Sequence, residues 1–373
     1  MTEVLLEELS NSDLQWLRMV GTQQQIEAGT ILVRQNQPVN FLYIVISGEF
    51  VATIAKNQGN LGRAFALLED EADLKEEINR FGSGETIGEM CFFDANLAVS
   101  TIEAAARGLV LVVPRKELQI KLRQDLSFAA RFYRAIALLL LNRFNKLVKV
   151  FLRRPRGQIA PLQDVPLIFG ELYDSDIDWL VEQGAIETIL AGETAIEAGQ
   201  QVENLYILIE GKMSVAVREV QRNRITSVFA ALESSGNNLL TESESAARQI
   251  ARVSKGEIIG EVVSLDVKLS PSTYRAVQNS ILLAIPRRQL LVKLQQDIGM
   301  GSRFYRIVVM LLAGRLDGLI SRLGFGRSSY RMGDRLSAET TYEDEIDLDV
   351  IDNLTIGGAR FDWMLKRLKI KGA

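Results

Sequence analysis

The chain has 373 residues, of which 47% are hydrophobic and 24% are charged, and its formal net charge is −4. This composition is typical of a globular protein long enough to form two domains of ordinary size. The sequence contains no histidine and one cysteine, Cys91, which removes the residue used most often for general-base catalysis and zinc binding and excludes an internal disulfide. We therefore expect a cytoplasmic protein that is not an enzyme, with no catalytic residue and no metal site.

The N-terminal residues carry acidic side chains where a secretory signal would carry basic ones. The longest apolar runs, residues 135–141 and 307–313, are far shorter than the roughly 18 residues that a membrane span needs. We therefore expect no transmembrane segment.

The two halves of the chain repeat one another. Early landmarks recur at one constant offset along the chain, and those from Ile87 onwards recur at a second, slightly larger constant offset. The matched sequences are Ser12-Asp13 with Ser175-Asp176, Ala28-Gly29 with Ala191-Gly192, Leu42-Tyr43-Ile44 with Leu205-Tyr206-Ile207, Ile87-Gly88-Glu89 with Ile259-Gly260-Glu261, Gln124-Asp125 with Gln296-Asp297, and Arg131-Phe132-Tyr133-Arg134 with Arg303-Phe304-Tyr305-Arg306. Landmarks in one order at two constant offsets predict two copies of one domain.

Each copy contains short alternating apolar runs, such as residues 41–46, with glycines at their ends. This pattern predicts the antiparallel strands of a small barrel. From Pro114 and Pro286 the apolar spacing becomes helical, which predicts one long amphipathic helix that closes each barrel. Residues 55–81 and 218–254 are too long for tight hairpins, so we expect a short helix or a loop within each.

The organisation along the chain follows from the repeat. Proline and glycine follow the first closing helix and mark the start of a linker. We expect a first domain at residues 1–152, a linker at 153–174, a second domain at 175–324 and an acidic tail at 325–373.

The repeated sequences resemble the cyclic nucleotide-binding domain family, over about residues 12–152 and 175–324. The most specific parts are the Ala-Gly turn, the Leu-Tyr-Ile-x-x-x-x-Gly strand and the Ile-Gly-Glu opening of the phosphate-binding cassette. The resemblance implies a mainly β fold with α-helices, in which two tandem double-stranded β-helix (jelly-roll) barrels are each followed by a long closing helix. It also implies a cyclic nucleotide as the ligand, and a regulatory role in signalling.

In the family, the cassette glycine and backbone amides receive the cyclic phosphate, and the glutamate bonds the ribose 2′-hydroxyl. An arginine about eleven residues past the glycine pairs the phosphate, which is a charge-assisted bond at a helix N-terminus. That arginine position falls at Val99 or Ala98 in the first cassette and at Pro271 or Ser270 in the second. The residues that remain for a ligand are Gly88, Glu89, Ser100 and Thr101 in the first cassette and Gly260, Glu261, Ser272 and Thr273 in the second.

Loss of a charge-assisted bond costs about 1.5–3 kcal/mol, so we expect both cassettes to be degenerate. Arg275 is near the second cassette, but family members with an intact cassette also carry arginine at that strand position. The competing interpretation of Gly88-Glu89 and Gly260-Glu261 is structural, with the glycine making a tight turn and the glutamate bonding nearby amides. For Cys91, a buried small hydrophobic residue is the favoured interpretation.

Both closing helices are basic, whereas acidic residues gather in the tail. Three interpretations are open: the helices pair with each other through an apolar seam, they rest on an anionic membrane through the aromatic and basic stretch 128–151, or they follow nucleic acid. The sequence pI of about 5.4 and the absence of a recognisable helix-turn-helix after residue 323 argue against DNA.

Near the C-terminus, apolar residues at positions i, i+3, i+4 and i+7 predict a short amphipathic helix over residues 360–368. Its candidate partner-binding residues are Phe361, Trp363, Met364, Leu365 and Leu368. The helix either docks on its own domain or recognises a protein partner or a membrane.

Taken together, we expect a non-enzymatic regulatory or scaffold protein whose closing helices pair within one chain to form a pseudo-dimer, and which acts through protein partners. The alternatives are a second-messenger sensor that binds a cyclic nucleotide in one or both cassettes, and a peripheral membrane-associated adaptor.

Overall fold

The computed structural model describes residues 3–55, 75–92, 98–152, 167–218, 247–322 and 348–370. The chain divides into two compact units. The first contains the described residues of Met1–Arg153, Pro166–Glu182 and Arg288–Ala373, and the second contains those of Gln183–Arg287. The first unit therefore includes the first barrel and most of the helices of both repeats, and the second unit is the second barrel.

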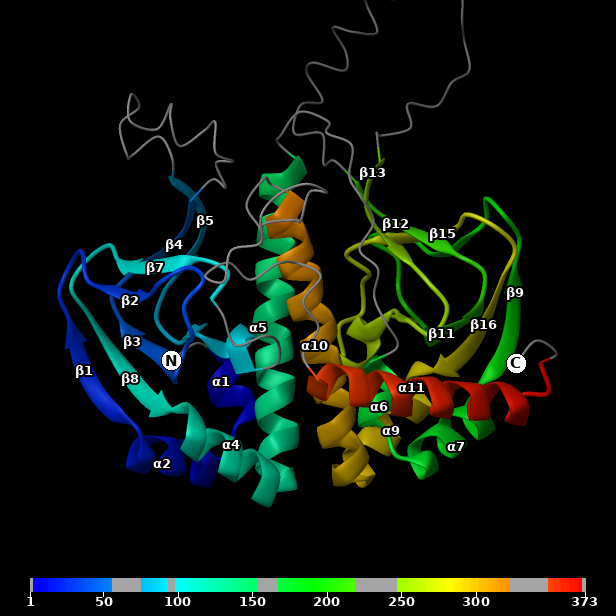
Figure 1. Cartoon of the computed structure of the whole chain (residues 1–373), viewed down its shortest axis with the longest axis horizontal. Coiled ribbons are helices and arrows are strands. Elements are labelled where there is room, and N and C mark those ends of the chain that lie inside the picture. The colour runs from blue at the N-terminus through cyan, green and yellow to red at the C-terminus, as the bar shows by residue number, and fades with distance from the viewer. Residues whose placement is uncertain are drawn as a thin grey trace, which may run out of the picture. The chain divides into compact units, whose positions relative to one another are not determined.

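The first barrel consists of two four-stranded antiparallel sheets with the orders β1-β8-β3-β6 and β2-β7-β4-β5 (Figure 1). The strands are β1 (Thr22–Ile26), β2 (Ile31–Val33), β3 (Phe41–Ser47), β4 (Phe50–Ala55), β5 (Lys75–Phe81), β6 (Thr86–Ile87), β7 (Thr101–Ala104) and β8 (Gly108–Pro114). Apolar side chains from both sheets, among them Val45, Phe50 and Val110, are fully buried between them and form the core.

The second barrel has the same construction, with the sheet orders β14-β11-β16-β9 and β10-β15-β12-β13. Its strands are β9 (Ala185–Ile189), β10 (Thr194–Ile196), β11 (Asn204–Glu210), β12 (Met213–Arg218), β13 (Ala247–Val253), β14 (Ile258–Ile259), β15 (Thr273–Ala276) and β16 (Ser280–Pro286). Two barrels with matching antiparallel topology confirm the predicted fold class.

The repeated Ala-Gly pairs form the predicted turns. Gly29 and Gly192 have φ values of 80° and 88°, in the left-handed region that glycine adopts most readily. Their backbone amides donate equivalent hydrogen bonds of 2.8 Å to the carbonyl oxygens of Ala104 and Ala276. The two turns therefore tie each early strand to the strand that follows its cassette.

The helices of the first repeat are α1 (Glu3–Glu8), α2 (Asn11–Val20), α4 (Arg115–Gln124) and α5 (Leu126–Leu152). Those of the second repeat are α6 (Leu167–Glu171), α7 (Asp174–Gln183), α9 (Arg287–Gln296) and α10 (Ile298–Arg322), and α11 (Leu348–Arg367) follows near the C-terminus. The predicted domain boundaries stay a prediction, although α6 lies within the segment 153–174 that we expected to be a linker.

A long closing helix follows each barrel as predicted, and a separate ten-residue helix precedes each long one. Asp125 separates α4 from α5, and Asp297 separates α9 from α10. Each aspartate accepts a 2.9 Å hydrogen bond from a backbone amide of the next helix, at Phe128 or Met300, which caps that helix. The break thus occurs at a matched residue of the repeat.

The predicted insertions at 55–81 and 218–254 are shorter than the sequence suggested, because residues 75–81 form β5 and residues 247–253 form β13. The rest of these segments, 56–74 and 219–246, lies outside the described residues.

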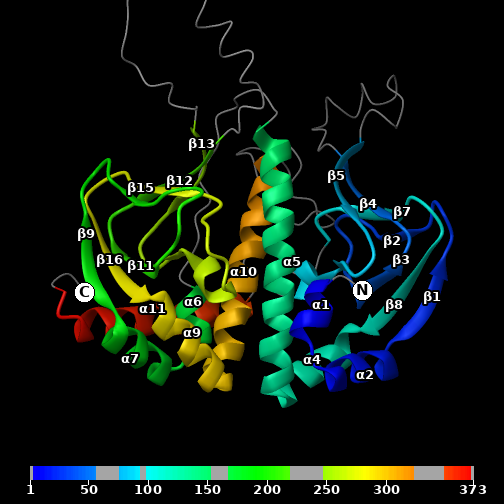
Figure 2. The same ribbon diagram turned by 180° about the vertical axis from the view of Figure 1, so that it is seen from behind.

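The two long helices α5 and α10 lie side by side, as both views of the molecule show (Figure 1, Figure 2). Apolar residues along both helices are buried, including Ile136 and Leu140 on α5 and Val309 and Leu312 on α10. This confirms the predicted pairing of the closing helices through apolar surfaces within one chain.

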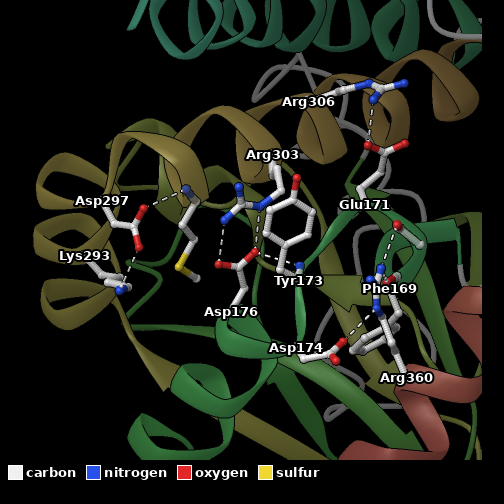
Figure 3. A network of polar contacts seen from close by, with 12 residues as sticks. Phe169, Glu171, Tyr173, Asp174, Asp176, Lys293, Asp297, Arg303, Arg306 and Arg360 are labelled. Carbon is white, nitrogen blue, oxygen red and sulfur yellow. Dashed lines mark hydrogen bonds and ion pairs between the residues drawn. The ribbon is translucent and has the colours of Figure 1, made fainter. Parts of the chain in front are cut away.

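Matched polar residues hold the short helices of each repeat against its long helix. Asp13 of α2 accepts hydrogen bonds of 2.7 and 3.1 Å from Arg131 of α5, and Asp176 of α7 accepts bonds of 2.7 and 2.8 Å from Arg303 of α10 (Figure 3). Burial by itself raises the pKa of Asp13, but hydrogen bonds from Arg131 and Ser10 outweigh burial and hold that pKa below its usual value. The aspartate of each Ser-Asp sequence and the first arginine of each Arg-Phe-Tyr-Arg sequence therefore form the same bidentate ion pair in both repeats.

Candidate functional site

The first barrel contains a cavity of about 620 Å³, part of which is open to solvent, beside the Ile-Gly-Glu sequence of its cassette. Strands, cassette and helices all contribute to its walls. The lining residues are Val33, Ala52, Ile78, Asn79, Phe81, Ile87, Gly88, Glu89, Met90, Ala98, Val99, Ser100, Ile102, Arg143, Leu147, Leu316 and Ile320.

The cassette is formed by the end of β6, by Gly88 and by a 3-10 helix over Glu89–Phe92. Gly88 has a φ of 94°, and a Cβ atom at this position would lie 2.7 Å from the carbonyl oxygen of Phe41. Only glycine fits here without displacing the backbone, so the predicted tight turn is present. The turn delivers Glu89 into the barrel, where the residue is 2% exposed. The side chain of Cys91 lies outside the description, so its predicted burial stays a prediction.

A buried ion pair joins the cassette to the closing helix. Arg143 of α5 donates from Nη1 to Oε1 of Glu89, and from Nη2 to the carbonyl oxygen of Thr86 over 2.5 Å. The guanidinium group also lies over the ring of Phe81, 4.8 Å from its centroid. Arg143 is only 7% exposed, so its charge is shielded from water. Glu89, Thr86 and Phe81 are the three neighbours that contact the guanidinium group.

Three buried polar atoms of the lining residues have no hydrogen-bond partner: Nδ2 of Asn79, Oε2 of Glu89 and Nε of Arg143. Buried polar groups in native proteins nearly always have a partner, because an unpaired group costs about 1–3 kcal/mol. All three atoms are buried within the wall of the cavity, so their hydrogen-bonding capacity is left unmet at the junction of the cassette, β5 and α5.

The other residues predicted for the first cassette have different surroundings. Ser100 is buried and lines the cavity, whereas the Thr101 hydroxyl accepts a 3.1 Å hydrogen bond from the backbone amide of Gln35. Ala98 and Val99, at the position of the family's phosphate arginine, also line the cavity. The cavity therefore receives its positive charge from the closing helix rather than from the cassette.

In the second cassette, Gly260 has a φ of 77° and begins the 3-10 helix Glu261–Leu265. Ser270 donates a 2.6 Å hydrogen bond from its hydroxyl to the carbonyl oxygen of Ser272, and the Thr273 hydroxyl accepts from the amide of Ala198 over 3.0 Å. Two of the hydroxyls around this cassette therefore bond to backbone groups of their own barrel.

Glu261 of the second cassette is buried, with 2% of its surface exposed, and Ser272 is buried as well. Arg275 instead lies exposed on β15, which agrees with the interpretation that it does not replace the missing arginine.

Sequence reasoning missed Arg143. A signal was available, because Arg315 occupies the equivalent position of the second repeat, on α10. A periodicity analysis assigns such an arginine to the solvent-exposed face. Only the fold reveals that Arg143 enters the barrel.

The candidate partner-binding helix is longer than predicted, since α11 covers Leu348–Arg367 rather than 360–368. It packs against α6, and the ring of Phe361 contacts that of Phe169 with centroids 5.1 Å apart. This packing supports a helix through two glycines that are unfavourable for an isolated one. Phe361, Met364 and Leu365 are buried, while Trp363 and Leu368 are partly exposed.

Two arginines fasten α11 in place. Arg360 donates to the carbonyl oxygens of Phe169 and Gly170 at the end of α6, over 3.2 and 2.9 Å, and to Asp174 over 3.1 Å (Figure 3). Arg367 pairs with Asp178 of α7 at 2.8 Å. Cations at the C-terminal end of a helix interact favourably with its exposed carbonyl groups. In this structure α11 is thus docked on α6 and α7 of its own chain, and partner binding by its apolar residues stays a prediction.

Three aromatic residues of the stretch 128–151 that was proposed for membrane contact, Phe128, Phe132 and Phe144, are buried rather than on the surface. Within the described part of the chain, no helix is both long enough and apolar enough to cross a bilayer. The same part of the chain contains no group of histidine, cysteine, aspartate or glutamate residues suited to a metal ion.

Each of the two jelly-roll barrels has a glycine and glutamate turn that leads into a short 3-10 helix, which is the construction of a phosphate-binding cassette. The family model of the cyclic nucleotide-binding domain matches residues 23–125 and 186–297, and the chain belongs to this family. This confirms the resemblance noted in the sequence.

A search of curated proteins gives no match. Among solved structures, the chain is similar to the regulatory domain of PKA from Toxoplasma gondii, crystallised with cAMP, at 13% identity over 80% of this chain and 89% of that chain, with a TM-score of 0.27. It is also similar to the guanosine-bound regulatory subunit of a cAMP-independent protein kinase A from Trypanosoma cruzi, at 17% identity over 79% and 81% of the two chains, with a TM-score of 0.26. A putative cyclic nucleotide-binding protein from Geobacter metallireducens is 11% identical over 37% of this chain and 90% of that chain, with a TM-score of 0.30.

Proposed function

We propose that this protein is a non-enzymatic regulatory protein, in which the first barrel senses a small nucleotide-related ligand and the paired closing helices pass the response to a protein partner. The observation that carries the proposal is the cavity at the first cassette, with its three unpartnered buried polar atoms. Membership of the cyclic nucleotide-binding domain family supports a ligand of this class.

The position of the cavity supports a direct connection between ligand and helices. Arg143 and Leu147 stand one turn apart on α5, and Leu316 and Ile320 stand one turn apart on α10, and all four line the cavity. A ligand in the first barrel therefore touches the closing helices of both repeats. Any difference in how it contacts them shifts the equilibrium between arrangements of α5 and α10.

A chain of contacts leads from α10 to the C-terminal helix. Arg306 of α10 pairs with Glu171 of α6 at 2.7 Å (Figure 3), and α6 is the helix against which α11 packs. A shift of α10 would therefore change the surface that holds α11. We propose that release or retention of α11 is the output read by a partner, which joins the sensor and scaffold interpretations of the sequence.

Cyclic nucleotides are the first ligands to test because they are the family's ligands. Isothermal titration calorimetry of the full chain with cyclic AMP, cyclic GMP, cyclic dinucleotides and unphosphorylated nucleosides measures whether any of them binds. We expect one bound ligand per chain. Absence of heat with every compound, together with absence of thermal stabilisation, would refute the sensor function.

A matched pair of variants locates the site. Glu89→Ala removes the cassette glutamate beside the cavity, and Glu261→Ala removes the equivalent glutamate of the second barrel. We expect at least a tenfold loss of affinity from Glu89→Ala, since a hydrogen bond to a charged group contributes about 1.5–3 kcal/mol, and little change from Glu261→Ala. The opposite result would move the site to the second barrel.

A further inference from the structure

One face of the sheet β10-β15-β12-β13 in the second barrel is positively charged (β12, β13 and β15 in Figure 1). Along β12 the side chains alternate, and since Met213 and Val215 are buried, Ser214 between them points out of the barrel. Strand pairing places Ser214 opposite Arg252 of β13 on one side and opposite Arg275 of β15 on the other. Both arginines are exposed, so they lie on the outer face of the sheet.

Two further residues extend this row. Thr194 of the edge strand β10 lies opposite Arg275 and is exposed. Lys212 comes directly before β12 and two residues before Ser214, so it belongs to the same face, and it is exposed as well. We call the outward surface formed by Thr194, Lys212, Ser214, Arg252 and Arg275 the basic face.

The charge of the basic face is not neutralised within the described part of the chain. Among the residues that the structure describes, none forms an ion pair with Lys212, Arg252 or Arg275. The strands that carry the two arginines are separated by one strand and are therefore about 10 Å apart. The basic face thus presents three exposed cations within a short distance of one another.

The matched face of the first barrel has the opposite charge. There, Arg80 pairs with Glu77 at 2.7 Å and with Glu49 at 3.1 Å. In the second barrel a glutamine and a lysine replace these two acids, and an arginine replaces a third acid, Glu103. The matched residues are Glu49 with Lys212, Glu77 with Gln249, Arg80 with Arg252 and Glu103 with Arg275. The strand framework and one arginine are therefore the same in both barrels, while the charges around that arginine are reversed.

We propose that the basic face is a docking surface for an acidic segment of a protein partner. Guanidinium groups bind carboxylates through charge-assisted hydrogen bonds, and the hydroxyl of Thr194 adds a neutral donor. The whole chain has a net charge of −4, so an acidic segment is attracted by this face and not by the overall field of the molecule. Three cations are also few for a nucleic acid, whose binding needs many phosphate contacts.

The test is fluorescence anisotropy of a labelled peptide of ten glutamates, titrated with the full chain at low and at high salt. We expect the peptide to bind at low salt and to lose at least tenfold in affinity at high salt, because contacts between exposed charges are screened. A peptide of ten glutamines with the same label should not bind.

A double variant locates the contact. Lys212→Glu combined with Gln249→Glu gives the second barrel the two acids that pair with the matched arginine of the first barrel. We expect it to weaken peptide binding at least tenfold, because Arg252 is then neutralised by its own barrel. The matched control is Lys116→Glu combined with Gln124→Glu, which changes the net charge equally at exposed positions of α4 and should leave the affinity unchanged. Thermal unfolding shows whether each variant is folded.

The outcomes decide the inference without reference to the ligand of the first barrel. Absence of peptide binding at low salt, or an equal loss of affinity in the two double variants, overturns the docking surface. A single-stranded DNA of twenty nucleotides that binds more tightly than the peptide, and is lost in the same double variant, overturns the acidic protein partner. Titration with nucleotides tests the proposed sensor function separately.

Discussion

Replacement of Arg143 by methionine tests the buried ion pair on which the site depends. Methionine keeps much of the side-chain volume but removes the charge, so the Glu89 carboxylate would stay buried without its partner. Loss of one member of a buried ion pair costs about 3–5 kcal/mol. Both side chains are at most 8% exposed, so solvent screening does not reduce this value much.

The matched control is Arg107→Met in the same barrel. Arg107 pairs with Glu27 at 3.3 Å, but these side chains are 64% and 70% exposed. Exposed pairs of this kind contribute about 0–1 kcal/mol. The same substitution should therefore be severe at Arg143 and nearly silent at Arg107.

Urea unfolding followed by tryptophan fluorescence measures both variants. The three tryptophans, Trp16, Trp179 and Trp363, all belong to the first unit, so the signal reports the unit that contains the ion pair. With a slope of about 1–3 kcal/mol per molar urea, the expected loss lowers the midpoint for Arg143→Met by about 1 M or more.

A double variant decides whether charge is the cause. Glu89→Leu combined with Arg143→Met removes both charges, and replacement of a whole buried pair by apolar residues is often close to neutral. We expect the double variant to recover most of the stability that Arg143→Met loses. If the two substitutions instead add their separate costs, or if Arg143→Met is as mild as Arg107→Met, the reasoning about a buried, mutually dependent pair is wrong.

Three further predictions concern the helices. Arg360→Ala should free α11 and raise the rate of hydrogen exchange over residues 348–370 by at least about tenfold, since it removes hydrogen bonds to two carbonyl oxygens. Arg367→Ala removes an ion pair that is half exposed, so it should change the exchange rate much less. Equal effects of the two substitutions would contradict the anchoring role of Arg360. A hydrogen bond from the Met300 amide and a second from Lys293 lower the pKa of Asp297 below 3.8. The ionised Asp297 carboxylate therefore stabilises the folded state above that pH, and this stabilisation is lost as the pH falls through the lowered pKa. In acid titrations of unfolding, the stability difference between wild type and Asp297→Asn should shrink below about pH 3.8, and a difference that grows there would contradict the argument. Leu316→Asp should weaken ligand binding to the first barrel at least tenfold although Leu316 belongs to the second repeat, and calorimetry that shows unchanged affinity would separate α10 from the site.

The fold was predictable because its determinants recur as short patterns in the sequence. Gly88 and Glu89 occur in a segment that is repeated in the second half of the chain, and glycine is the residue that adopts the positive φ of this turn most readily. The break between α4 and α5 was harder to predict, because an aspartate in a helical pattern indicates a cap only when the neighbouring packing permits a turn. In the structure Asp125 does act as a cap, because its carboxylate accepts a hydrogen bond from the Phe128 amide.

The site was only partly predictable, since its decisive contacts join residues that are distant in the sequence. Glu89 and Arg143 come from the cassette and the closing helix, and no local pattern shows that they meet. The same is true of Arg360, whose acceptors at Phe169 and Gly170 lie on a helix that the sequence analysis assigned to a linker. Tertiary packing, which sequence periodicity does not encode, determines both contacts.

Comparison of the two repeats shows that the surface under α11 is specific to the second one. Phe169 is fully buried beneath α11, whereas the matched residue of the first repeat, Leu6, is 49% exposed. Asp174 and Asp178 pair with the arginines of α11. Their counterparts in the first repeat are neutral, because the matched positions hold an asparagine and a glutamine.

The residues that hold each repeat's own helices together are, in contrast, identical in both copies. Asp13 and Asp176 pair with equivalent arginines, Arg131 and Arg303. The positions that contact α11 thus differ between the two repeats, whereas this ion pair is the same in both. The first repeat has the cavity bordered by α5 and α10, and the second has the surface that holds α11. The helix α10 contributes to both features, since Leu316 and Ile320 line the cavity and Arg306 pairs with Glu171 of α6.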